Sequence, residues 1–423
     1  MLKKPLQIAA VAATIALAAT GCAPAGSDST GASGELSGKV TLWMYPVIKD
    51  ETVSKKFWSD TEADFEKKHP GVDLTIELQT FDKRDAQISA ALAANSGPDI
   101  ALVTPDQAAT YLAVGGLLPV DEAVNKERES FVPATLKSAT FDGELYGVPI
   151  FQNINSTAYN TKIFADAGLD LPETWADVKA AAPVLAEKGI AVMDYAGSPE
   201  QTLNLTFYPL LWQAGGTVFT EDGKDIAFDS AEGVEALQFL VDLMESGGLP
   251  IDAAVAGSKI DGAPIAGGKV AMRATTSLAE LGLLRGALGD ENVVLGAPLK
   301  GNVQATYGNP GLLALTSINK KENRDAAYEV LSYLSSAEAQ AALNAAASNF
   351  PTRTDVKSED ENADTDALNA ALEFANFGEA SPVARQVMAI LAPSIQAALG
   401  GKVTAKEALS KAADEARALL KRS

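Results

Sequence analysis

From Gly38 onward, segments with the period of a β-strand alternate with segments that have the period of an α-helix. Residues 72–78 alternate strictly between apolar and polar side chains, which is the pattern of a half-buried strand. Helical spacing runs through 52–68 before it, and Asp82 can cap a second helix that extends to residue 95. A strand, helix, strand, helix succession predicts an α/β fold with a mostly parallel sheet covered by helices.

The rest of the chain continues in the same way. No period of about 20–50 residues repeats, so a solenoid of repeats is not predicted. Further strands are predicted at 39–44, 99–103, 146–150 and 190–193, and further helices at 107–114, 207–213, 231–244, 325–334, 338–347, 384–398 and 405–421.

The 423 residues include one histidine and one cysteine. A zinc cluster, a disulfide framework or a Ser-His-Asp triad cannot be built from this supply without using both or importing another chain. His69 lies where a helix ends and a Pro-Gly turn follows, which favours a structural role. Phosphate-loop, dinucleotide-binding and nucleophile-elbow motifs do not occur. We therefore expect no enzyme activity, no cofactor and no metal.

The charge balance sets limits on partners. The chain has 34 Lys and Arg against 55 Asp and Glu, which gives a net charge of −21. An excess of this size repels phosphate backbones, so we expect no nucleic-acid partner.

The first residues are typical of a secretory signal. Lys3 and Lys4 precede an apolar run at 8–19, which is shorter than the about 20 residues that a membrane helix needs. The exit Ala19-Thr20-Gly21-Cys22 resembles a bacterial lipoprotein box, in which the cysteine becomes the lipidated first residue of the mature chain. Plain secretion with a free thiol is the alternative. We expect a signal peptide at 1–21 and a flexible, Ser- and Gly-rich tether at 22–37.

Several phrases in the body resemble one family. The chain is similar to extracellular solute-binding proteins of the maltose-binding-like group, which are lipid-anchored receptors of ATP-driven (ABC-type) sugar importers. The most specific phrase, Phe-Asp-Gly-Glu-Leu-Tyr-Gly-Val-Pro, lies at 141–149. The others, in family order, lie at 65–71, 96–100, 115–121, 159–162, 167–169, 172–175, 268–272 and 334–340.

The resemblance implies a two-lobed α/β protein with the type II periplasmic-binding-protein-like fold, whose chain crosses between the lobes at a hinge. Lobe one is expected at 38–150 plus 300–350, and lobe two at 151–299 plus 351–423. It also implies a sugar ligand trapped in the cleft by hinge closure, delivery to a membrane permease, a monomer, and attachment to the outer face of the cell membrane through lipid on Cys22.

Several candidate ligand residues lie past predicted strand ends, where open α/β sheets bind ligands, and Gln152 and Asn153 lie in the hinge phrase after Pro149. Tyr208 and Trp212 lie four apart on one face of a predicted helix. Sugars present hydroxyls to polar groups and C–H faces to aromatic rings. The resemblance places an acid that grips sugar hydroxyls at Asp106, while Leu278 replaces a tryptophan that relatives carry. Trp43 could equally belong to the core, Arg353 could bridge the lobes, and Arg385 could face the cleft or water. The candidates are Trp43, Tyr45, Phe81, Asp82, Asp106, Gln152, Asn153, Tyr208, Trp212, Thr276, Ser277, Tyr307, Asn309 and Arg353.

Two alternatives stay open. A secreted glycosidase would need two carboxylates roughly 5–10 Å apart. Because the chain has 55 Asp and Glu, their number gives no information on whether such a pair exists. The receptor could also bind a polyol or another small polar solute.

Overall fold

The computed structural model describes residues 36–81, 84–199, 202–357 and 362–422. The expected signal segment 1–21 and most of the tether 22–37, with Cys22, lie outside the described residues, as does Asp82. What the sequence indicates for them stays a prediction.

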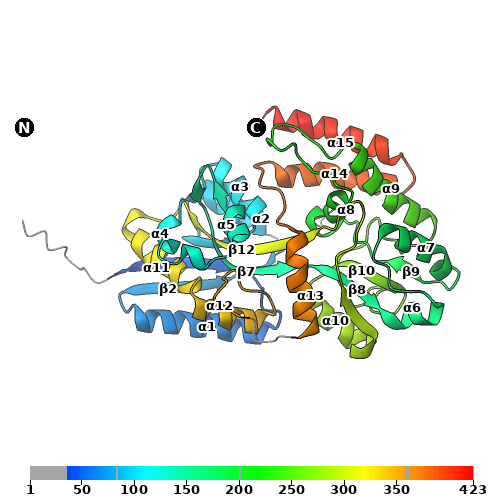
Figure 1. Ribbon diagram of the computed structural model, residues 1–423. Helices are drawn as coiled ribbons and strands as arrows, with labels where there is room; N and C mark the ends of the chain where they lie inside the picture. Colours follow the sequence, from blue (N-terminus) through cyan, green and yellow to red (C-terminus); the bar gives the residue numbers. More distant parts are fainter. Residues whose placement is uncertain (1–35, 82–83, 200–201, 358–361, 423) are drawn as a thin grey trace, which may run out of the picture. The chain divides into compact units, whose positions relative to one another are not determined.

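The first sheet has seven strands, with the order β13-β12-β3-β1-β2 and with β4 and β7 also paired to β12. Figure 1 labels β2, β7 and β12 of this sheet. β1 pairs in parallel with β2 and β3, as predicted. β12 runs antiparallel to β3, β4 and β7, so the expectation of a mostly parallel sheet is wrong there. A strand that enters the sheet without a helical crossover is free to run either way. The strands are β1 (Gly38–Met44), β2 (Val72–Leu78), β3 (Ile100–Val103), β4 (Leu117–Leu118), β7 (Val148–Ile154), β12 (Thr306–Thr316) and β13 (Ala375–Asn376).

Helices cover this sheet, and their sequences explain where they begin. Asp50 caps α1, because its carboxylate accepts a hydrogen bond of 2.8 Å from the backbone N–H of Val53. Thr104 and Gln107 form a capping box at the start of α3. The helices are α1 (Glu51–Lys68), α2 (Arg84–Ala94), α3 (Pro105–Ala113), α4 (Asp121–Val124), α5 (Pro133–Ser138), α11 (Arg324–Leu334) and α12 (Ala337–Ala347), and a small hairpin joins β5 (Thr140–Phe141) to β6 (Glu144–Leu145).

The second sheet has four strands in the order β11-β8-β10-β9. Only β9 and β10 pair in parallel, while β8 pairs antiparallel with both β10 and β11. Its strands are β8 (Ser156–Asn160), β9 (Ala191–Met193), β10 (Val270–Thr276) and β11 (Val293–Gly296). The helices of this half are α6 (Thr161–Ala167), α7 (Trp175–Ala186), α8 (Phe207–Gln213), α9 (Ala231–Glu245), α10 (Leu278–Leu288), α13 (Ala363–Ala371), α14 (Ala384–Leu399) and α15 (Ala405–Leu420).

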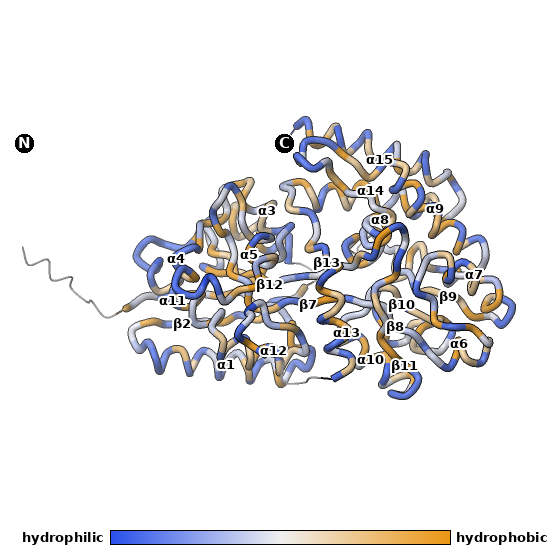
Figure 2. Tube along the Cα trace, viewed as in Figure 1, coloured by the Kyte–Doolittle hydropathy of each residue, from blue (hydrophilic) through white to orange (hydrophobic). Residues whose placement is uncertain are grey.

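Each sheet has a hydrophobic core of its own, which makes the protein two-lobed as expected. The first core contains Trp58 and Phe65 from α1 together with the inward side chains of β1 and β3. The second contains Trp175, which stacks on Phe239 with ring centroids 4.5 Å apart. Outer helices alternate between hydrophilic and hydrophobic residues along their length, because one face packs on a core (Figure 2). We call the part built on the seven-stranded sheet the first lobe and the other the second lobe.

The connections between the lobes are tied together by backbone pairing. β7 leads directly into β8, and β12 pairs antiparallel with β7, with Asn309 opposite Asn153 and a register shift between Gly311 and Leu312. The segment after α12 adds a bridge between Gln152 and Phe350. The residues at which the chain changes lobe, predicted as 150, 300 and 350, stay a prediction.

Candidate functional site

A cavity of about 420 Å³ lies between residues of the two lobes. Its lining includes Lys49, from the loop after β1, and Ser277, the N-cap of α10. Asn153 and Asn155 contribute from β7 and the residue after it, and Tyr307 and Asn309 contribute from β12. Residues from both lobes and from the strands that join them therefore surround one space, as a ligand cleft requires.

The connecting strands give this cavity a polar wall. The side-chain amide of Asn155 donates a hydrogen bond of 2.9 Å to the carbonyl of Tyr307. The side-chain oxygen of Asn309 is buried and accepts no hydrogen bond from any described residue. A buried acceptor without a donor is costly, and a ligand hydroxyl would satisfy it.

Next to this wall, an ion pair joins the lobes. Asp106 lies in the first turn of α3 and its side chain is 1% exposed. One of its oxygens accepts a hydrogen bond from the hydroxyl of Thr104, and the other lies 2.6 Å from Nε of Arg385 on α14. Burial acts to lower the pKa of Arg385, but the carboxylates of Asp106 and Asp85 outweigh it and raise that pKa.

Aromatic rings from α8 of the second lobe and from β12 lie beside the ion pair. The rings of Trp212 and Tyr307 are 6.4 Å apart at 30°, and those of Tyr208 and Trp212 are 6.1 Å apart at 51°. The hydroxyl of Tyr208 is buried without a hydrogen-bond partner among the described residues. Burial raises the pKa of Glu379 to about 7, and the indole of Trp212 opposes this rise. All three rings belong to the second hydrophobic core and are at most 5% exposed, and Tyr307 also lines the cavity.

A third group comes from the first lobe. The rings of Tyr45 and Phe81 stack with centroids 5.5 Å apart, and the guanidinium carbon of Arg84 lies 5.4 Å from each centroid. Burial raises the pKa of the Tyr45 hydroxyl to about 12, against the nearby charge of Arg84. That hydroxyl is buried and has no hydrogen-bond partner among the described residues.

The structure therefore brings many of the predicted site residues together in three groups. Other predicted residues have their polar atoms engaged elsewhere. The indole of Trp43 donates to Glu77 on β2, the amide of Gln152 donates to the carbonyl of Pro351, and the hydroxyl of Thr276 donates to the carbonyl of Arg273. The residues brought together are Asn153, Ser277, Tyr307 and Asn309 at the cavity, Asp106, Tyr208 and Trp212 at the ion pair, and Tyr45 and Phe81 beside Arg84.

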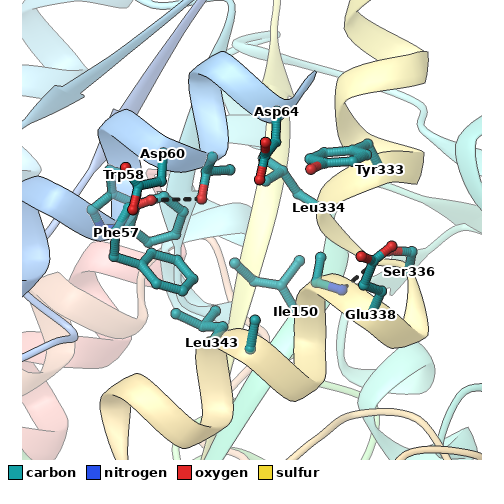
Figure 3. Close-up of a pocket in the computed structure, with 13 residues that line it drawn as sticks. Phe57, Trp58, Asp60, Asp64, Ile150, Tyr333, Leu334, Ser336, Glu338 and Leu343 are labelled. Carbon is teal, nitrogen blue, oxygen red and sulfur yellow. Dashed lines mark hydrogen bonds between the residues drawn. The ribbon is translucent and has the colours of Figure 1, made fainter. Parts of the chain in front are cut away.

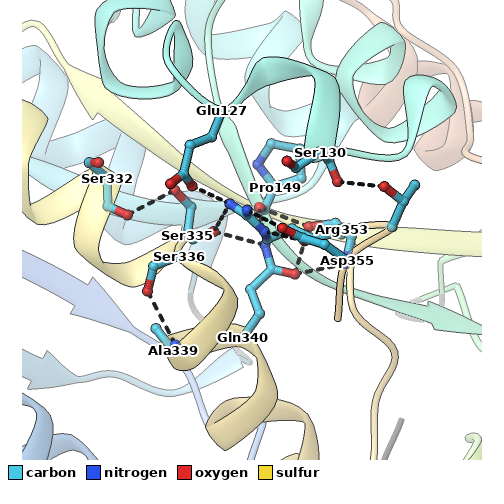
Figure 4. Close-up of polar contacts among 12 residues, drawn as sticks. Glu127, Ser130, Pro149, Ser332, Ser335, Ser336, Ala339, Gln340, Arg353 and Asp355 are labelled. Atoms are coloured by element: carbon cyan, nitrogen blue, oxygen red, sulfur yellow. Dashed lines mark hydrogen bonds and ion pairs between the residues drawn. The ribbon is translucent and has the colours of Figure 1, made fainter. Parts of the chain in front are cut away.

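Arg353, also predicted in the site, does not line the cavity and lies in a network of its own (Figure 4). Its side chain is 4% exposed and forms ion pairs with Glu127 at 2.6 Å and with Asp355 at 2.7 Å. Nearby, the amide of Gln340 donates to the carbonyl of Pro149 and accepts from the backbone of Thr352. These contacts hold the segment that contains Thr352 and Arg353 against the first lobe, close to the start of β7.

Sequence reasoning missed Arg84 and Glu379 and left Arg385 undecided. Arg84 lies three residues after Phe81 in the sequence, so the choice of Phe81 could have drawn attention to it. Glu379 lies between β13 and α14, where no periodic pattern predicts which way a side chain points.

A second hollow lies in the first lobe and is lined by residues of α1, α11 and α12 and by Ile150 of β7 (Figure 3). Its volume is about 180 Å³, and its walls include Phe57, Ile150 and Leu343. Several of its polar groups already have partners, since Asp60 pairs with Lys56 and Glu338 with Lys68. It offers no polar atoms from the second lobe, and we do not assign it to the ligand.

The described residues were considered for metal-binding groups and for membrane-spanning helices. Among them, no group of three or more His, Cys, Asp and Glu side chains could hold a metal ion. None of their helices is both long and apolar enough to cross a membrane.

Comparisons with known proteins point to one family. The profile of the family described as bacterial extracellular solute-binding protein matches residues 46–341. An arabinooligosaccharide-binding protein of Halalkalibacterium halodurans is 31% identical over 177 residues, which is 41% of this chain and 39% of that protein. The diacetylchitobiose-binding protein DasA of Streptomyces coelicolor is 29% identical over 145 residues, 34% of this chain and 33% of that protein. The chain thus matches well under half the length of either relative.

Solved structures match over nearly the whole chain. The GacH receptor of Streptomyces glaucescens, studied unliganded and with acarbose, superimposes with a TM-score of 0.77 at 25% identity, covering 92% of this chain and 99% of that one. The cyclic alpha-maltosyl-1,6-maltose binding protein of Arthrobacter globiformis has a TM-score of 0.77 at 22% identity, covering 92% and 100%. Both share the two-lobed fold.

Proposed function

The chain belongs to the family of bacterial extracellular solute-binding proteins, and from that premise we propose that it is the receptor of an ABC-type importer that captures a mono- or oligosaccharide between its lobes. The observation that carries the proposal is the cavity of about 420 Å³, which is lined from both lobes and from the strands that join them. A ligand that touches both lobes stabilises the closed arrangement, because only that arrangement completes its contacts.

The chemistry of the groups around the cavity supports a carbohydrate. Asn309 and Tyr208 hold buried polar atoms that lack partners among the described residues, and Tyr307 adds an aromatic residue to the cavity wall. A sugar offers hydroxyls that donate and accept as well as C–H faces that lie on aromatic rings. The relatives whose names mention arabinooligosaccharide and diacetylchitobiose support the same class of ligand.

Binding without catalysis is part of the proposal. The family is one of binding proteins, and Asp106, the most buried acid of the site, is held by Arg385 and Thr104. A glycosidase needs one carboxyl group free to donate a proton and another free to attack or to activate water. Incubation with oligosaccharides followed by product analysis tests this point, and turnover would overturn it.

Cellular location and partners complete the proposal. Lipid on Cys22 would hold the receptor, as a monomer, at the outer face of the cell membrane. The flexible tether at 22–37 would let the folded part move away from the membrane surface. The closed form would then deliver its ligand to the permease subunits of the importer.

A polyol is the second candidate ligand, because Leu278 stands where many relatives carry a tryptophan platform and packs against the apolar cores. Calorimetry with a panel of monosaccharides, maltotriose, arabinooligosaccharides and polyols separates the candidates. Tight binding of a saccharide supports the receptor proposal, and the absence of binding by any carbohydrate or polyol would refute it.

A further inference from the structure

Arg273 is a buried arginine behind the second-lobe wall of the cavity. It lies on β10, its side chain is 9% exposed, and it is not one of the described residues that line the cavity. The pairing of β10 with β8 is irregular between Arg273 and Thr276. Irregularities of this kind change the direction in which the side chains of a strand point. Because water hardly reaches the guanidinium, its N–H groups need partners inside the protein.

The guanidinium has such partners in four directions. Its Nε donates to the carbonyl of Thr275 at 3.3 Å, and Nη1 donates to the carboxylate of Asp194 at 2.9 Å. Its Nη2 donates to the carbonyl of Ser258 at 3.3 Å and to the carboxylate of Glu280 at 3.1 Å. One planar group with donors on three nitrogens thus joins β10, the residue after β9, the loop at 258 and the first turn of α10.

Two of these partners belong to the wall of the cavity. Ser258 and Glu280 both line it, and Lys259 and Asp261, in the same loop as Ser258, line it as well. Arg273 therefore contacts the wall from the side that is turned away from a ligand.

The loop has few other attachments near its centre. Before it, the carbonyl of Ala256 accepts a hydrogen bond of 3.0 Å from the backbone of Ser198. After it, Ile260 is 4% exposed and packs in a small apolar cluster. The hydrogen bond from Arg273 to the carbonyl of Ser258 holds the loop between these two points.

The first turn of α10 is held from the same side. One oxygen of Glu280 accepts from Arg273, and the other accepts from the backbone N–H and from the hydroxyl of Ser277, each at 2.9 Å. Ser277 lines the cavity. Because its hydroxyl donates its proton to Glu280, it can offer a ligand only an acceptor.

We propose that Arg273 is a positioning residue of the ligand site. It holds the loop at 258–261 and the first turn of α10 in one arrangement before a ligand arrives, and so lowers the ordering cost that binding would otherwise carry. It acts through these two segments and does not touch the ligand. The proposal rests on the proposed receptor function and adds a residue outside the cavity to those that determine its affinity.

The test compares two buried arginines. Arg353 is 4% exposed, pairs with two carboxylates and lies outside the cavity wall, so the same substitutions there are matched controls for a general loss of stability. Arg273→Lys keeps a positive charge beside Asp194 and Glu280, but an ammonium group cannot reach partners in four directions. Arg273→Met removes the charge and the donors together. If Arg273→Met does not fold, Arg273→Lys carries the test.

The first readout is affinity. Calorimetry uses glucose, maltotriose, arabinotriose and mannitol as probes, and the variants are compared on the probe that the wild type binds most tightly. We expect Kd to rise about fivefold or more for Arg273→Lys and further for Arg273→Met, and by less than about twofold for the Arg353 variants.

The second readout needs no ligand. Hydrogen exchange of the unliganded protein should become faster at 257–261 and 277–281 in the Arg273 variants, and should stay unchanged there in the Arg353 variants. Thermal unfolding of each variant shows how much stability it has lost.

Three outcomes would overturn the proposal. Arg273→Lys could bind as tightly as the wild type, hydrogen exchange at the two segments could stay unchanged, or the Arg353 variants could lose as much affinity as the Arg273 variants. The last result would make the loss a consequence of stability alone. Each leaves the receptor function standing. A wild-type chain that binds none of the probes would contradict the receptor function instead, and hydrogen exchange would still decide whether Arg273 orders the wall.

Discussion

The carboxylate of Asp106, on α3 of the first lobe, lies 2.6 Å from Nε of Arg385, on α14 of the second lobe. The side chain of Asp106 is 1% exposed and that of Arg385 is 28% exposed, so water reaches the guanidinium group but hardly reaches the carboxylate. The two residues lie far apart in the sequence, and their contact joins the lobes beside the aromatic rings of Tyr307 and Trp212.

Arg385→Ala should destabilise the protein, because it leaves the buried charge of Asp106 with only the hydroxyl of Thr104. We expect the free energy of unfolding to fall by about 1–3 kcal/mol, less than for a fully buried pair because water reaches Arg385. Urea denaturation measures the change. Arg422→Ala is the control, and Asp106→Asn in the same chain should recover part of the loss. An Arg385→Ala protein as stable as the wild type would show that the ion pair contributes nothing.

Arg353→Met should reduce stability and leave ligand affinity nearly unchanged. The substitution removes ion pairs with Glu127 and Asp355 and a hydrogen bond to the carbonyl of Ser335 at a side chain that is 4% exposed. We expect a loss of about 2–4 kcal/mol in the free energy of unfolding. Calorimetry on the folded variant provides the second readout. A large loss of affinity without a loss of stability would return Arg353 to the ligand site.

Asn309→Ala should weaken ligand binding without a large effect on the fold. Its side-chain oxygen is buried, has no donor among the described residues and lies on the cavity wall. Loss of the ligand hydrogen bond should lower the affinity by about 0.5–1.5 kcal/mol, a few-fold in Kd. Asn302→Ala, at an asparagine that bonds to Ala214 and Glu235 instead, is the matched control. Equal affinities for the two variants would show that the ligand lies elsewhere.

Cys22→Ala should release the protein from the membrane fraction. The prediction of a lipid anchor rests on the lipoprotein box that ends at Cys22. This segment lies outside the described residues. One lipid chain gives marginal membrane binding and several make it stable. Immunoblots of soluble and membrane fractions measure the outcome, and retention of Cys22→Ala in the membrane fraction would contradict lipid anchoring through this residue.

Local patterns predicted the elements of the fold but not the contacts between its lobes. The alternation at 72–78 predicted β2, and the Thr104 to Gln107 spacing explains the start of α3, since both depend on neighbours in sequence. The antiparallel direction of β12 could not be predicted in this way, because strand direction depends on the path of the chain between lobes. Helical spacing likewise fixes which face of α14 is buried, but it does not determine that Arg385 meets Asp106.

The residues of the site likewise include some that the sequence predicted and some that it did not. Tyr307 and Asn309 were chosen because they lie at a glycine-rich entry to a strand, and the structure places both on the cavity wall. Arg84 and Glu379 were missed because their importance comes from burial among residues distant in sequence. Arg353 was chosen because it follows the Phe-Pro-Thr segment at 350–352, yet it forms ion pairs with Glu127 and Asp355 instead.

Glu379→Gln should make stability less dependent on pH. The folded protein raises the pKa of Glu379 from 4.5 to about 7, chiefly through burial. The folded state therefore holds this proton more tightly than the unfolded chain, so the contribution of Glu379 is neutral below pH 4.5 and becomes increasingly unfavourable as pH rises to 7. A glutamine cannot ionise. The variant should match the wild type near pH 4.5 and exceed it at pH 8, by at most about 3 kcal/mol. Urea denaturation at the two pH values measures the difference.

Glu373→Gln, at an exposed neighbour, is the control. Parallel pH profiles for Glu379→Gln and the wild type would mean that Glu379 ionises in the folded protein as it does in the unfolded chain.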